Sequence, residues 1–143
     1  MKMKFLTTVA LLSTISLAAP VSVQAANPAH VQKLRENGAC AGCDLTGANL
    51  KGAHLIGADL RNANLKGANL QDANLEGADL TGANLKEANM KEAFVNSASL
   101  NNANLTNADL RNANLDSTEL KGAVLAGVKF NGSYIANTGA RNR

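Results

Sequence analysis

Tryptophan is absent from the 143-residue chain, which has one tyrosine and only three phenylalanines. A core built on aromatic side chains is therefore excluded, and buried surface has to come from aliphatic residues. The only histidines are His30 and His54, which leaves a zinc site short of ligands. No nucleophile stands beside a base, and no carboxylate pair has a pocket-like context, so the sequence predicts neither an enzyme nor a cofactor.

A long hydrophobic run is also missing. The stretch Phe5–Ala19 is apolar except for Ser and Thr, and it is shorter than the roughly 20 residues that span a bilayer. Lys2 and Lys4 precede it, and small or apolar residues lead up to Ala25. This layout predicts a signal peptide over residues 1–25, with export to the periplasm or secretion. In a photosynthetic source the destination would be the thylakoid lumen, with no stable membrane insertion after cleavage.

The mature chain has almost no excess of charge of either sign. The sequence contains 14 Lys and Arg against 11 Asp and Glu. Lys2 and Lys4 belong to the predicted leader, and removing them leaves 12 basic and 11 acidic side chains. Because nucleic-acid binding depends on positive charge that neutralises phosphates, this balance argues against a nucleic-acid partner.

From Cys43 to Asn137 the sequence has a five-residue period through nineteen consecutive units. Fifteen central positions are Leu, and fifteen positions two residues earlier are Ala. The fifth position is Gly nine times and Asn five times. A fixed short period of this kind indicates a repeat architecture.

The physical meaning of the period follows by elimination. Five residues of α-helix advance by about 500°, so the Leu side chains would leave no single buried stripe. In a flat strand an odd period would send every second Leu to the opposite face. The pattern closes only if the chain turns a corner in each repeat, and Gly and Asn tolerate the positive φ of such turns. The sequence therefore predicts a solenoid with Leu and Ala inside.

These units resemble the pentapeptide-repeat family, whose motif is A(D/N)LXX. The resemblance implies an all-β solenoid, a right-handed quadrilateral β-helix with four repeats per coil. Residues twenty apart, such as Leu45 and Leu65, would then stack at about 4.8 Å. The family's best-known activity is mimicry of DNA in binding a topoisomerase, DNA gyrase. That alternative function requires an acidic surface and a cytosolic location, and the sequence predicts neither.

The solenoid is expected to cover residues 40–137, preceded by a capping region at 26–39 and followed by a tail at 138–143. Within the capping region, Asn27 to Asn37 reads as a short helix that closes the raw N-terminal end of the coil. Asn27 is placed to cap it and Gly38 to end it.

Cys40 and Cys43 stand where the capping region meets the solenoid, in register with inward positions. In an exported protein, two thiols this close favour a structural disulfide. Three alternatives are weaker. A thioredoxin-type redox pair would need a βαβ context, and covalent haem would need a His after the second Cys. A zinc site would need further ligands. Resemblance to exported family members with a similar CxxCDL start supports the structural role.

With four repeats per coil, one side of the rod gathers its most apolar and aromatic outward residues. We take them as a candidate interaction face, formed by His54, Ile56, Phe94 and Tyr134. The last repeats lose the consensus, and the polar tail looks too short to cover them, so a homodimer through the C-terminal end is a further hypothesis. The sequence thus favours an exported, non-enzymatic structural or protein–protein interaction module with an unidentified protein partner.

Overall fold

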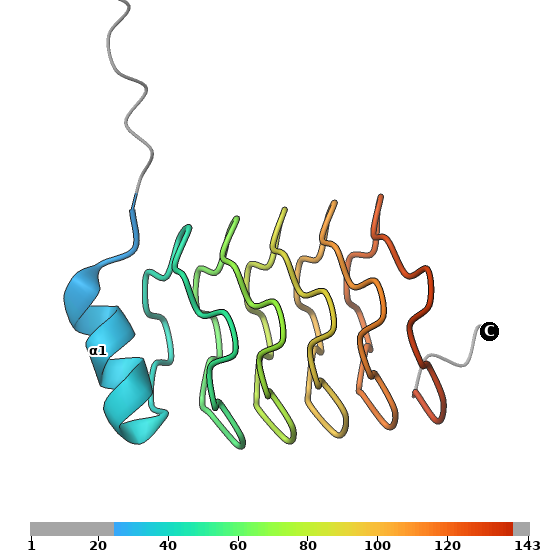
Figure 1. Ribbon diagram of the computed structural model, residues 1–143, viewed down its shortest axis with the longest axis horizontal. Coiled ribbons are helices and arrows are strands. Elements are labelled where there is room, and N and C mark those ends of the chain that lie inside the picture. Colours follow the sequence, from blue (N-terminus) through green and yellow to red (C-terminus); the bar gives the residue numbers. More distant parts are fainter. Residues whose placement is uncertain (1–24, 139–143) are drawn as a thin grey trace, which may run out of the picture.

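The computed structural model describes residues 25–138 and shows one helix packed on the end of a regular rod (Figure 1). The helix is α1 (Pro28–Asn37), and the rest of the described chain is a coil of short turns. Residues 1–24 of the predicted leader and 139–143 of the predicted tail lie outside the described residues. Between residues 25 and 138, no helix has the length and apolar character needed to cross a membrane.

Helix α1 begins and ends at the residues that the sequence predicts. Asn27 has extended backbone geometry, and its side-chain oxygen accepts the N–H of Ala29 at 3.0 Å. Gly38 adopts a left-handed conformation with φ 68°, and its N–H donates to the carbonyl of Leu34 at 2.9 Å. Leu34 is buried and Val31 is partly buried against the core, whereas Ala29 is exposed. The apolar contact of the helix with the first coil therefore rests on Leu34 and Val31.

Successive coils pair in parallel at a spacing of twenty residues, which confirms four repeats per coil. Bridges join Asp44 to Asn64 and Asn64 to Asn84, and the pattern continues along the rod. The N–H of Leu45 donates to the carbonyl of Asn64 at 2.8 Å, and the N–H of Asn64 donates to the carbonyl of Cys43 at 2.8 Å. The first bridge joins Ala39 to Asp59, so the ladder begins one repeat before the first one recognisable in the sequence.

Each repeat ends in a corner closed by a backbone hydrogen bond, such as the one from the N–H of Ala48 to the carbonyl of Leu45 at 3.0 Å. The fifth position has positive φ throughout, for example 65° at Gly47 and 55° at Asn62. Glu87 and Glu92 adopt the same geometry, with φ of 60° and 59°. Residues other than glycine rarely adopt positive φ, so the coil imposes this backbone conformation on Glu87 and Glu92.

The interior is a stack of Leu and Ala side chains. Leu65, Leu85 and Leu105 are fully buried, as are the Ala residues between them. Burying one such Leu contributes roughly 1.5–3 kcal/mol, which explains how the rod forms without tryptophan. The last coil differs, because Leu125 is 37% exposed and Ile135 is 46% exposed although both occupy inward positions. No described coil covers them from the C-terminal side.

Candidate functional site

Most second-position side chains of the repeats are used by the fold itself. The Oδ1 atoms of Asn74 and Asn114 accept the N–H of the residue two further on at 3.0 Å in both cases. The same contact recurs at the other Asp and Asn residues of this position, and it is the reason the motif requires them. Asn84 additionally donates to Asn64 at 3.0 Å, which forms an amide contact between coils. Among second-position residues of other types, Ser99 and Glu119 form side-chain hydrogen bonds within the rod, whereas Phe94 and Tyr134 stand exposed.

The candidate interaction face (His54, Ile56, Phe94 and Tyr134) lies along one side of the rod. Parallel bridges join His54, Asn74, Phe94, Asn114 and Tyr134 in a single column. With coils about 4.8 Å apart, successive rings along it stand about 10 Å apart. Phe94 is 51% exposed, Tyr134 is 62% exposed and Ile56, beside His54 in the sequence, is 63% exposed. The fold thus aligns three rings that are forty residues apart in sequence.

Two carboxylates flank this column, at Glu76 and Asp116. Neither forms an ion pair with a described residue. Asp116 accepts a hydrogen bond from the side-chain amide of Asn137 at 3.1 Å. The face therefore combines exposed rings with a weak negative charge, and its polar groups are mainly amides.

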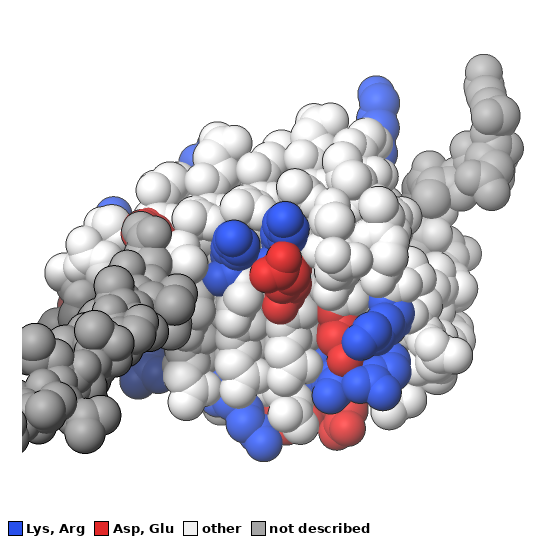
Figure 2. Space-filling model, turned by 90° about the horizontal axis from the view of Figure 1, so that it is seen from above, with Lys and Arg blue, Asp and Glu red and all other residues white. Residues whose placement is uncertain are grey.

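Several charged side chains on the other faces pair with one another. Figure 2 shows red and blue side chains together in two places on one face, with further Lys and Arg standing alone. Arg111 donates through Nε and Nη2 to the two carboxylate oxygens of Asp109, at 2.9 and 2.8 Å. This side-chain hydrogen bond, aided by the Arg111 N–H and the charges of Arg111 and Lys91, lowers the pKa of Asp109 to about 2 against the opposing effect of burial. Asp59 and Arg61 form the same pair in an identical ADLRN repeat.

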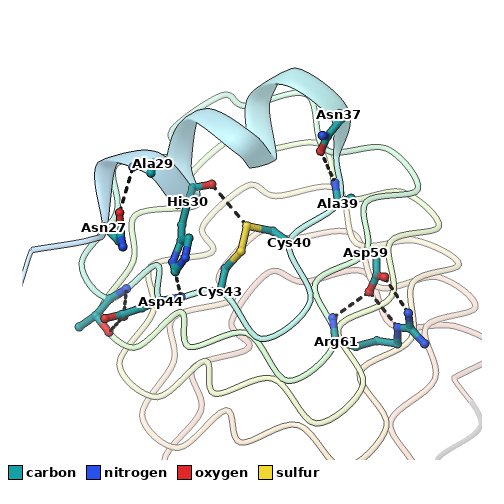
Figure 3. The surroundings of a disulfide bond; sticks show 11 residues. Asn27, Ala29, His30, Asn37, Ala39, Cys40, Cys43, Asp44, Asp59 and Arg61 are labelled. Atoms are coloured by element: carbon teal, nitrogen blue, oxygen red, sulfur yellow. Dashed lines mark hydrogen bonds and ion pairs between the residues drawn. A yellow bond between two sulfur atoms is a disulfide. The ribbon is translucent and has the colours of Figure 1, made fainter.

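At the capped end, Cys40 and Cys43 form a disulfide beneath α1 (Figure 3). Cys40 is fully buried and Cys43 is 4% exposed. The sulfur of Cys40 lies 3.3 Å from the carbonyl oxygen of His30. Both sulfurs therefore occupy inward positions against the helix, a setting that suits a structural bridge better than an exposed redox pair.

The two histidines have different environments. His30 is half-buried, and its Nδ1 accepts the N–H of Asp44 at 3.0 Å, which ties α1 to the first coil (Figure 3). His54 is exposed on the candidate interaction face. Residues 25–138 contain no group of three or more His, Cys, Asp or Glu side chains that could hold a metal ion.

Two features escaped the sequence analysis. An open C-terminal end was expected, but not that Val124, which is 48% exposed, adds to Leu125 and Ile135 there; a Val where the motif has Asp or Asn was the available signal. Arg35 of α1 reaches the carbonyl of Asn49 at 3.2 Å. Nothing in the repeat pattern indicates that contact, because it depends on how the helix docks.

Comparison with known proteins identifies the repeats. The family profile described as pentapeptide repeats matches eight copies, over residues 43–82, 63–107 and 96–132. The matched region extends from residue 43 to residue 132, more than half of the chain. A search of curated protein sequences gives no match.

Solved structures include similar chains. A pentapeptide repeat protein from the Arabidopsis thaliana thylakoid lumen is 39% identical, with a TM-score of 0.62 and 64% of each chain covered. The match therefore spans less than two thirds of that protein's length. A pentapeptide repeat protein from the cyanobacterium Cyanothece 51142 is 25% identical, with 77% of this chain and 96% of that chain covered and a TM-score of 0.37. HetL from Nostoc sp. strain PCC 7120 is 31% identical, with coverage of 67% and 50% and a TM-score of 0.28.

The family match and the four-sided coil agree on the architecture. Bridges at a spacing of twenty residues give four repeats per coil, as the family fold requires. The predicted right-handed quadrilateral β-helix with a short N-terminal capping helix is confirmed. The chain belongs to the pentapeptide-repeat family.

Proposed function

We propose that the protein is an exported, non-enzymatic rod that binds a protein partner through the candidate interaction face. The observation that carries this proposal is the alignment of His54, Phe94 and Tyr134 in one column of the coil. Aromatic side chains dominate the binding energy of protein interfaces because they bury a large area with few rotatable bonds. A column with a ring on every second coil suits a partner that lies along the rod.

The interior supports a binding role rather than catalysis. The inward positions are occupied by Leu and Ala, and Leu65 and Leu85 have no exposed surface. Enzyme sites are concave pockets with converging polar groups, whereas Ile56, Phe94 and Tyr134 of the candidate face are exposed apolar or aromatic side chains. Recognition would therefore rest on the surface side chains of the coil.

A double variant tests the partner proposal. Phe94→Asp/Tyr134→Asp adds two charges to the column, and Gln71→Asp/Asn131→Asp adds the same two charges on another face. A partner recovered from the exported compartment with the wild type should also be recovered with the control and be lost with the column variant. Equal recovery with both variants would show that this face does not bind it.

Export is supported by the leader pattern of residues 1–25 and by the Cys40–Cys43 bridge, since disulfides persist in oxidising compartments. The relative from a thylakoid lumen is consistent with an exported location. The intact mass of the protein recovered from cells tests both features. We expect a chain that begins at Ala26 and is two hydrogens lighter than its reduced form. A full-length chain with free thiols would contradict export.

A homodimer through the C-terminal end is the accompanying proposal for assembly. Leu125 and Ile135 present apolar surface at the open coil, and Val124 adds to it at the rim. Light scattering after size exclusion should give a dimer mass at micromolar concentration. Leu125→Glu/Ile135→Glu should give a monomer. A wild-type protein that is strictly monomeric would contradict the proposal.

A further inference from the structure

A hollow of about 320 Å³ lies where α1 meets the first coil of the solenoid. Arg35 lines it from the helix, and Lys51, Ala53, His54 and Leu55 line it from the coil. The described lining contains two cationic side chains, one imidazole and no carboxylate. A hollow with this composition is electrostatically complementary to an anion.

Arg35 is held in place with most of its hydrogen-bonding capacity unused. One Nη donates to the carbonyl oxygen of Asn49 at 3.2 Å, and this contact fixes the guanidinium on the coil. A guanidinium has five N–H donors, and no carboxylate of the described chain forms an ion pair with Arg35. A side chain that is already positioned loses less conformational entropy when it binds a ligand.

The neighbouring carboxylates do not neutralise the hollow. Asp72 lies 3.9 Å from Nζ of Lys51, with both side chains about half exposed at 41% and 54%, and such a surface pair is weak. Glu36 follows Arg35 on α1 and accepts a hydrogen bond from Gln32 at 2.7 Å. Glu36 lines a second hollow on the helix, which Arg35 also borders, but it forms no ion pair with Arg35 or any other described residue.

The remaining wall of the hollow is apolar. Ala53 is half-buried and offers apolar surface to a ligand, whereas Leu55 is only 2% exposed. We propose that this hollow binds a small organic anion, with its carboxylate on Arg35 and Lys51 and its apolar group against Ala53. The planar fork of a guanidinium matches a carboxylate through two parallel hydrogen bonds. This site goes beyond the proposed partner face and shares only His54 with it.

Titration of the ¹⁵N-labelled protein with benzoate, at constant ionic strength, tests the proposal by NMR. We expect saturating shift changes at the Arg35 Nε–H and at the amides of residues 51–55. Arg35→Gln should weaken binding about tenfold or more, since a hydrogen bond to a charged group contributes about 1.5–3 kcal/mol. Lys121→Gln, which removes an exposed cation near the other end of the rod, should leave the affinity unchanged.

The outcomes separate this site from a general attraction of anions. Shifts that stay linear with benzoate concentration, or that persist in Arg35→Gln, would overturn the proposal. Acetate or inorganic phosphate binding as tightly as benzoate would overturn the part assigned to Ala53. The Phe94→Asp/Tyr134→Asp variant should bind benzoate as the wild type does. The proposed partner face and this site can therefore be tested independently, and the failure of one does not contradict the other.

Discussion

The Oδ1 atom of Asn62 occupies the position that a Cβ on Gly82 would take in the next coil. Both residues form corners, with φ of 55° and 69°. The same relationship joins Asn102 to Gly122, Asn107 to Gly127 and Asn112 to Gly132. An Asn corner therefore favours glycine one coil later, because a Cβ there would require the Asn side chain to move. At Gly67 an added Cβ would meet nothing within 4 Å.

Gly82→Ala should destabilise the rod more than Gly67→Ala. Each variant carries the cost of about 1–2 kcal/mol for an L-residue in the left-handed region, and only Gly82→Ala also displaces the Asn62 side chain. Urea unfolding followed by circular dichroism measures the difference. In an Asn62→Gly background, Gly82→Ala should cost no more than Gly67→Ala. Equal losses in the original background would show that the overlap is relieved without cost.

The fold could be predicted from the sequence because its period admits few geometries. A five-residue repeat with Leu in the middle closes only as a coil, and the helix caps at Asn27 and Gly38 are local signals. The corners at Glu87 and Glu92 were not indicated by residue type, because neighbouring coils impose their positive φ. Backbone pairing twenty residues away overrides the local preference there.

The candidate face could also be placed on one side of the rod from the sequence. With four five-residue repeats per coil, residues twenty apart fall in the same column. Whether Phe94 and Tyr134 bind a partner stays a prediction. The hollow at Arg35 could not be predicted, because it depends on the docking of α1 and on the carbonyl of Asn49. Contacts between a helix and a solenoid do not follow from either element's own pattern.

Glu92→Gly should stabilise the protein. Glu92 has φ 59° and forms no ion pair with a described residue. Removing the left-handed cost of about 1–2 kcal/mol outweighs the backbone entropy of about 0.5–1 kcal/mol that glycine adds. The free energy of unfolding should rise by about 1 kcal/mol. Lys66→Gly, at a position without positive φ, should lower it, and a loss in both variants would refute the assignment of strain to Glu92.

Thr118→Val should destabilise the last full coil. Thr118 replaces Ala at an inward position, is fully buried, and donates through Oγ1 to the carbonyl of Val95 at 2.9 Å. Valine keeps the shape but removes this bond, with an expected loss of about 1 kcal/mol in unfolding free energy. Thr106→Val removes a hydroxyl bond to Asn104 at a partly exposed site, where water replaces it. A Thr118→Val protein as stable as the wild type would rule out a stabilising role for the buried hydroxyl.

The Asp109–Arg111 pair should make the free energy of unfolding decrease at acidic pH. The pKa of Asp109 is lowered to about 2, first by the side-chain hydrogen bond from Arg111, against about 3.9 in an unfolded chain. A carboxyl whose pKa is lower when folded stabilises the fold above its unfolded pKa. That contribution is lost as the pH falls from about 4 towards about 2.

Unfolding free energies measured between about pH 6 and about pH 2 should therefore fall less steeply for Asp109→Asn than for the wild type. Glu76→Gln removes a carboxylate that has no ion-pair partner among the described residues, and it should leave the slope unchanged. NMR titration of the Asp109 carboxyl gives the direct comparison. A midpoint near that of an unfolded aspartate, together with parallel curves for the wild type and Asp109→Asn, would mean that the pair does not couple folding to pH.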